Sequence, residues 1–208
     1  MAPASEARRR PERSRGDVRE ARLLEIAEAL LREGRFEQAS IAELAAAAEI
    51  SRPTFYFYFA SKQSLLERLV ESTLDELITR HQQRIRQHED APAAELRGIL
   101  HDVADMWVEH GVVLSAAVDV PSLFDRIAGV MESVVEDRAR FFMEAGSTPE
   151  VADPATARET TEALFWMSER NFYVVARRDP SAESLHALAD RLFRIWARVA
   201  GIEHESAS

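Results

Sequence analysis

The chain contains no cysteine and no long apolar run. Without cysteine it can form neither disulfide bonds nor a zinc site with thiolate ligands. It also lacks a signal-peptide core and any stretch of about 20 apolar residues, so we expect a cytoplasmic protein without membrane partners. Only 7 glycines and 8 prolines occur in 208 residues, mostly at predicted helix edges, which leaves few long loops.

Signatures of catalysis are missing as well. There is no glycine-rich phosphate loop, and the six histidines show no HExxH spacing, so we expect them to face solvent. We predict no enzymatic activity, no cofactor and no metal site. A mixed-charge helical face is expected from the following residues: Glu132, Glu136, Asp137, Arg138 and Arg140.

Charge is distributed unevenly along the chain. The net charge of −10 argues against a general nucleic-acid coat, but residues 1–62 carry 11 basic and 10 acidic side chains, and residues 63–208 carry 15 and 26. Five of the basic residues are arginines within residues 1–16. We expect residues 1–18 to be a disordered basic arm that either contacts DNA or only increases solubility. Residues 204–208 are expected to be a disordered tail.

The most unusual feature is the run of five aromatic residues Phe55–Phe59. Ser51 can cap a helix that begins there, and Pro53 falls in the first turn, where it loses no helical hydrogen bond. At about 100° per residue, Phe55 and Phe59 share one face, which we predict to be core. The opposite face then holds out aromatic side chains, which is unusual for a surface without a partner.

The preceding segment predicts a partner helix. Ser40 and Glu43 have capping-box spacing, and the apolar residues that follow form one stripe. A turn of about 3–4 residues separates this helix from Ser51, which is the geometry of a helix-turn-helix. An upstream apolar stripe that ends near Gly34 predicts a third helix in the same small core.

The run Ile50–Lys62 resembles the recognition-helix signature of the TetR family of bacterial transcriptional regulators, most closely its EthR-type repressors. The resemblance in sequence covers about residues 20–70, the size of such a domain, and beyond it lies in the helix layout. It implies an all-α fold of about nine helices. Residues 19–66 would form the helix-turn-helix DNA-binding domain, and residues 67–203 a helical effector-binding and dimerisation domain.

The resemblance also implies roles for the recognition helix. Arg52 would read base edges, while Pro53 or Phe57 would touch a thymine methyl group. Phosphate contacts would come from hydroxyl groups and from an ammonium at the start of the next helix. Two alternatives stay open: the aromatic residues pack only as core, or Arg52 pairs with Glu49 on the surface. The predicted DNA-binding set is Ser40, Arg52, Pro53, Thr54, Tyr56, Phe57, Tyr58 and Lys62.

Residues after 61 are expected to be helical throughout. A long helix should run to about residue 88 and connect the two domains. Asp153-Pro154 and Asp179-Pro180 each place a cap before a proline, which predicts the starts of the last two helices. The predicted ranges that follow the long helix are 93–110, a short segment over 112–120, 121–146, 154–178 and 180–201.

The last two predicted helices carry apolar residues on more than one face, and the family resemblance implies that they form a homodimer interface. A dimer would place two recognition helices about 34 Å apart, on successive major grooves of palindromic double-stranded operator DNA. The resemblance further implies a cavity for an elongated hydrophobic small-molecule effector. Ordinary core is the alternative for its aromatic candidates, and solvent or the dimer interface for its one amide. The candidates are Trp107, Phe124, Met131, Trp166, Asn171, Phe172 and Trp196.

Three functional hypotheses follow. The first is a homodimeric repressor that a hydrophobic effector releases from its operator. The second is a helical small-molecule-binding protein or enzyme without specific DNA binding. The third is a DNA-binding dimer whose second domain is filled by side chains and takes no effector.

Overall fold

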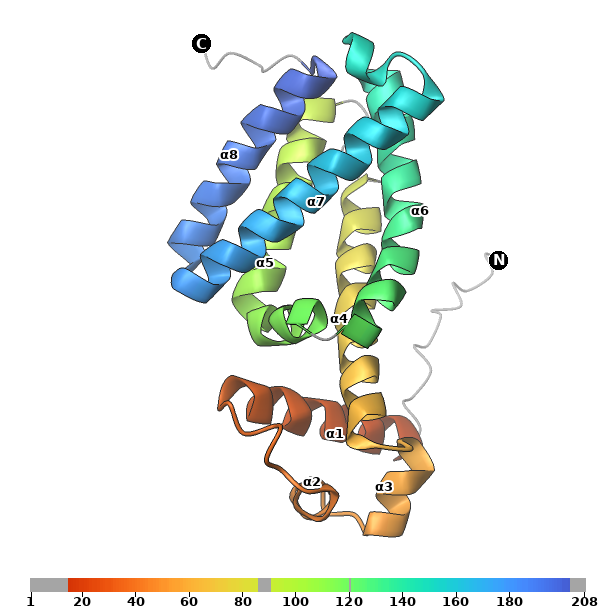
Figure 1. Ribbon diagram of the computed structural model, residues 1–208, viewed down its shortest axis with the longest axis vertical. Helices are drawn as coiled ribbons and strands as arrows, with labels where there is room; N and C mark the ends of the chain where they lie inside the picture. Colours follow the sequence, from red (N-terminus) through yellow and green to blue (C-terminus); the bar gives the residue numbers. More distant parts are fainter. Residues whose placement is uncertain (1–14, 86–90, 120, 203–208) are drawn as a thin grey trace, which may run out of the picture. The chain divides into compact units, whose positions relative to one another are not determined.

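The computed structural model describes residues 15–85, 91–119 and 121–202, and within these ranges every regular element is helical (Figure 1). This confirms the all-α prediction. None of the described helices is long and apolar enough to cross a membrane. The elements are α1 (Arg15–Arg32), α2 (Ile41–Ala47), α3 (Arg52–Tyr58), α4 (Lys62–Ile85), α5 (Pro92–Asp119), α6 (Pro121–Ala145), the 3-10 helix η1 (Pro149–Val151), α7 (Pro154–Arg178) and α8 (Ala182–Ala200).

The chain divides into two compact units, residues 1–69 and 70–208, and helix α4 contributes to both. In the first unit, α1 ends before Gly34, whose φ of 68° is the left-handed conformation expected of a helix stop. The capping box of Ser40 and Glu43 is present at the start of α2, and Ser51 caps α3. The helix stop at Gly34 and the caps at Ser40 and Ser51 are therefore formed as the sequence predicts.

A tight turn joins α2 to α3. Glu49 takes a positive φ of 56°, and Ile50 donates its backbone N–H to the carbonyl of Ala45 at 2.9 Å. The small core beneath this turn brings together side chains from four helices, all fully buried: Leu23, Leu44, Phe55 and Leu65. Because α2 and α3 have only seven residues each, their positions depend on this shared core more than on their own helix propensity.

In the second unit the most extensive helix contacts are α5 with α8 and α6 with α7. Figure 1 shows the chain running along α6 to the short connection that holds η1 and returning along α7, which is inclined to α6. That connection is fastened to the end of α8, because Ser147 donates its backbone N–H to the carbonyl of Ala200 at 2.9 Å. The start of this connection is thus held against the C-terminal end of α8.

The break predicted after residue 110 is present. The helix expected over 93–110 and the short segment expected over 112–120 both lie in α5, on the two sides of a kink at His110, where φ is −126° and ψ is 21°. Eight α-helices are described, close to the predicted nine. One predicted boundary needs correction. Helix α8 begins at Ala182 and not at residue 180, because Ser181 is its cap and Asp179 ends α7.

Candidate functional site

Helix α3 separates its aromatic residues between core and surface. Phe55 and Phe59 are buried, while Phe57 is 81% exposed and Tyr56 is 47% exposed. The predicted division by angle is confirmed, and the reading of the aromatic run as core alone is wrong. The rings of Phe57 and Tyr58 pack edge to face, with 5.2 Å between their centroids, and together form an aromatic surface on α3.

The polar residues of this surface lie at the helix starts. Arg52 and Pro53 are exposed in the first turn of α3, and no described residue forms an ion pair with Arg52, so the alternative pairing with Glu49 is not formed. The hydroxyl groups of Thr54 and Ser51 share a hydrogen bond at 2.8 Å. Ser40 is exposed at the start of α2, where its backbone N–H lowers the pKa of Glu43.

Lys62 occupies a different position from the one expected of a phosphate contact. Its ammonium donates to the backbone carbonyls of Phe36 at 2.9 Å, Glu37 at 2.6 Å and Ala39 at 3.4 Å. It also lies 5.2 Å from the centre of the Phe36 ring. An ammonium has three donors, and in this structure all three are directed at these carbonyls. Through these hydrogen bonds Lys62 connects the start of α4 to the loop between α1 and α2.

A cavity of about 210 Å³ lies within residues 70–208. Its wall comes from α4 to α8 and consists mainly of Leu, Ile, Val and aromatic side chains. All three tryptophans of the chain, Trp107, Trp166 and Trp196, line it, and so does Phe172. The structure thus brings together four of the seven predicted ligand-site residues.

The other three candidates do not belong to the described wall. Asn171 is exposed, and its amide donates to the carbonyl of Met167 one turn back along α7 at 2.7 Å. It therefore points away from the cavity that its neighbour Phe172 lines. The side chains of Phe124 and Met131 lie outside the described residues.

The sequence reading missed the polar residues of the cavity wall. Arg138 and Thr161 are 4% and 1% exposed, and Arg138 forms a buried ion pair with Glu95 at 2.9 Å. Arg138 is therefore not part of a solvated mixed-charge face. Glu169 also lines the cavity, and burial raises its pKa. A usable signal existed for Thr161, because it interrupts an apolar stripe of α7 one turn after Ala157 and before Leu164.

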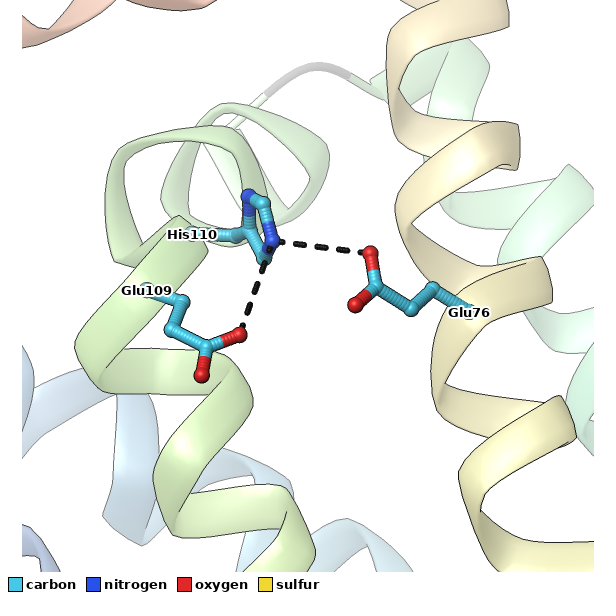
Figure 2. Close-up of side chains that lie close together, drawn as sticks. All are labelled: Glu76, Glu109 and His110. Carbon is cyan, nitrogen blue, oxygen red and sulfur yellow. Dashed lines mark ion pairs between the residues drawn. The ribbon is translucent and has the colours of Figure 1, made fainter.

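A cluster of charged side chains joins α4 to α5 outside the cavity wall. Figure 2 shows His110 between the carboxylates of Glu76 and Glu109, with Nε2–Oε2 distances of 3.7 and 3.9 Å. One ligand atom from each residue lies within 4.8 Å of the others, a spacing that a metal ion could use. However, Arg80 already bonds to both carboxylates at 2.6 Å, and its hydrogen bond to Glu109 raises the pKa of Arg80. The cluster is therefore an ion-pair network.

A second polar network joins α5 to α8. The Nδ1 atoms of His101 and His186 lie 2.8 Å apart and the two rings stack. Nε2 of His101 meets Asp190 at 3.1 Å, and Nε2 of His186 meets Asp105 at 3.0 Å. Arg97 also donates to Asp190 at 2.8 Å. These two histidines are half-buried and bonded, so the prediction that they face solvent is wrong.

Two short helices joined by a tight turn, with an exposed aromatic and cationic second helix, define a helix-turn-helix transcriptional regulator. Residues 23–69 match the family of bacterial regulatory proteins, tetR family. The chain is 27% identical to the HTH-type transcriptional regulator EthR of Mycolicibacterium smegmatis over 94% of each chain. It is 44% identical to the HTH-type transcriptional regulator EthR of Mycobacterium tuberculosis over 68 residues, 33% of this chain and 32% of that one.

Solved structures of other transcriptional regulators have the same fold as this chain. The fatty acid degradation regulator FadR from Bacillus halodurans superposes with a TM-score of 0.70 at 16% identity, over 91% of this chain and 96% of that one. A putative TetR-family transcriptional regulator from Mesorhizobium loti superposes with a TM-score of 0.66 at 16% identity, over 90% of this chain and 98% of that one. Residues 23–69 of this helix-turn-helix transcriptional regulator thus match the tetR family, and the chain as a whole is similar to EthR. Such regulators bind operator DNA and typically act as dimers with small-molecule effectors.

Proposed function

We propose that this protein is a cytoplasmic homodimeric repressor that binds a palindromic operator and is released by an apolar small molecule. The observation that carries the DNA-binding part is the face of α3. Phe57 is 81% exposed beside exposed Tyr56, on a helix whose first turn presents an unpaired Arg52 among the described residues. A folded protein rarely exposes so much aromatic surface without a partner.

The chemistry of α3 assigns a role to each exposed group. The Arg52 guanidinium can donate two hydrogen bonds to one guanine, and Pro53 or Phe57 can contact a thymine methyl group. The hydroxyl groups of Ser40, Thr54, Tyr56 and Tyr58 can donate to phosphates, which would fix the register without reading sequence.

Dimerisation is proposed through α7 and α8. A helix-turn-helix reader needs a second copy, because a palindrome presents two half-sites about 34 Å apart. Helix α8 leaves Ile195 44% exposed although most of its other large apolar residues are buried. This apolar position would be covered by the second copy.

The cavity supports the effector part of the proposal. A cavity with a mainly apolar wall and a smaller number of polar side chains is typical of a small-molecule site. A ligand that fits the cavity better in one arrangement of the dimer than in the other would change operator affinity, and operator DNA would change ligand affinity by the same factor.

The test is the binding of DNA from upstream of the protein's own gene, followed by fluorescence anisotropy and footprinting. We expect a two-fold symmetric footprint, two protein chains per site, and an affinity that falls steeply with salt. A scrambled fragment of equal length and composition is the control. Equal affinities for the two fragments at each salt concentration would exclude operator recognition.

A further inference from the structure

The described part of the first unit has too little positive charge for a protein that binds a polyanion. Residues 15–69 carry 8 basic and 9 acidic side chains, which gives a net charge of −1. DNA binding depends on cations that neutralise phosphate groups and release their counter-ions. The hydroxyl groups proposed to contact phosphates contribute hydrogen bonds but no charge. The cations that hold the DNA backbone must therefore come from a part of the chain not yet considered.

Most cations of this unit are already in ion pairs. Five of them have a carboxylate between 2.9 and 3.9 Å away: Arg22, Arg32, Arg35, Lys62 and Arg68. Exposed ion pairs are weak, so an arginine can leave its partner for a phosphate. The glutamate would then remain near the DNA with an uncompensated negative charge, which would offset the gain.

Two cations of the unit remain. Among the described side chains of residues 16–69, only Arg19 and Arg52 are cations that form no ion pair, and both are exposed. Arg52 is the residue proposed to read base edges. Arg19 lies near the start of α1 and has no role in the recognition helix. It is therefore the one described cation that is available for the DNA backbone.

The start of α1 lies on the side of the unit that holds α3. Glu20 of α1 accepts a hydrogen bond from Nε of Arg68 at 2.9 Å, in the second turn of α4, and α4 begins three residues after the end of α3. Figure 1 shows the same arrangement, because one end of α1 continues into the loop to α2 and the other end, its start, lies toward α3. Residues that precede α1 therefore join the unit on the side of the helix proposed to read DNA.

The segment before α1 is rich in arginine. Of the basic arm predicted over residues 1–18, residues 15–18 belong to α1 and the others lie outside the described residues. Residues 8–13 hold four arginines and one glutamate: Arg8, Arg9, Arg10, Arg13 and Glu12. A fully extended chain covers about 3.4 Å per residue, so Arg8 can reach up to about 24 Å from the start of α1. This reach equals about seven base pairs of duplex DNA.

We propose that the start of α1 is a second DNA-binding surface, in which Arg19 and the four arginines of residues 8–13 bind the phosphate backbone beside the groove that α3 occupies. The basic arm then contacts DNA and does not serve solubility alone. The proposal rests on the proposed function only in taking double-stranded DNA as the partner. It supplies the positive charge that residues 15–69 lack.

An arm variant without charge tests the surface. It carries Arg8→Gln, Arg9→Gln, Arg10→Gln and Arg13→Gln, and its affinity is measured by fluorescence anisotropy over a range of salt concentrations. The two DNA probes are the fragment from upstream of the protein's own gene and a random duplex of about 30 base pairs. Each lost phosphate contact lowers the slope of log affinity against log salt by about 0.9, so we expect a fall of at least about 2 per bound chain on both probes. A smaller fall would overturn the proposal and leave the arm a solubilising segment.

A second arm variant keeps the charge by placing lysine at the same four positions. Phosphate neutralisation depends on charge, so we expect this variant to keep the salt slope of the wild type to within about 0.5. A slope as low as that of the glutamine variant would show that the arm does not act by neutralising phosphates and would overturn the proposal.

Arg19→Gln and Arg22→Gln form a matched pair on α1. Each removes one positive charge from an exposed side chain, but only Arg22 is paired, with Glu25 at 3.1 Å. We expect the salt slope to fall by about 0.9 in Arg19→Gln and by less than about 0.3 in Arg22→Gln. Equal reductions would show that net charge alone matters and would overturn the assignment of Arg19.

The random duplex separates this inference from the proposed function. If the wild type binds both probes equally and the glutamine arm variant loses slope on both, operator recognition fails and the second surface stands. If the wild type prefers the upstream fragment and the glutamine arm variant keeps its slope, operator recognition stands and the second surface fails.

Discussion

Arg138 of α6 donates from Nη1 to Oε1 of Glu95 on α5 at 2.9 Å, and 5% of each side chain is exposed. The free-energy penalty of removing both charges from water offsets much of their electrostatic attraction. Burial also lowers the pKa of Arg138, against the opposing effect of the hydrogen bond to Glu95. The pair should therefore stabilise the second unit only when both partners are present.

We expect Glu95→Ala to lower the free energy of unfolding by about 3–5 kcal/mol, because it leaves the Arg138 charge buried without its partner. The double variant Glu95→Leu with Arg138→Met should be about as stable as the wild type or more stable, since it removes both charges. Urea unfolding followed by circular dichroism measures both. A double variant less stable than Glu95→Ala would contradict this view of the pair.

Glu169 should make stability depend on pH. Burial raises its pKa above the ordinary value of 4.5, and Arg170 opposes this in part. Between the unfolded and the higher folded pKa, the folded protein binds more protons than the unfolded one, so stability falls as pH rises through this window. Glu169→Gln should therefore raise the melting temperature more at pH 7 than at pH 4. Glu159→Gln, at an exposed position of the same helix, is the control and should show no such difference.

The two faces of α3 should respond differently to truncation. Phe55→Ala should cost about 3–5 kcal/mol of stability, because the ring is fully buried. Phe57→Ala should change stability by no more than about 0.5 kcal/mol, because its ring is exposed. We expect Phe57→Ala nevertheless to weaken operator binding, as measured by anisotropy. Unchanged operator affinity in this folded variant would remove Phe57 from the DNA interface.

A Lys62 variant can distinguish a structural role, in which the ammonium holds the loop between α1 and α2, from a contact with a DNA phosphate. Lys62→Met removes three hydrogen bonds to the loop between α1 and α2, so we expect a lower melting temperature. A lost phosphate contact would reduce the slope of log affinity against log salt by about 0.9. We expect the slope to stay unchanged. Its reduction without a loss of stability would restore the phosphate role.

Arg52→Ala should relax the base preference at one position of each half-site by about 1–3 kcal/mol. Stability should remain within about 0.5 kcal/mol of the wild type, since the side chain is exposed. Competition binding with single-base operator variants measures the preference. Equal losses of affinity for operator and random DNA would show that Arg52 contacts only the backbone.

Local signals in the sequence predicted local structure well. The caps Ser40, Ser51 and Asp153 are formed as expected, because a cap depends only on residues within one turn. The division of α3 into Phe55 and Phe57 faces follows from the helical period alone. The exposed face of α3 is therefore predictable from the sequence alone.

The polar wall of the cavity was not predictable in the same way. Arg138 looked like part of a charged surface, because its partner Glu95 lies 43 residues earlier in the chain. Lys62 looked like a free cation for a similar reason, since the carbonyls that it binds lie 23 to 26 residues away. Only tertiary packing decides which charges are paired.

The network between α5 and α8 also fixes how far one helix can slide along the other. Nδ1 of His101 meets Nδ1 of His186 at 2.8 Å, and Nε2 of each ring meets a carboxylate of the opposite helix, Asp190 at 3.1 Å and Asp105 at 3.0 Å. A displacement of α8 by one turn, about 5.4 Å, would break all three contacts together.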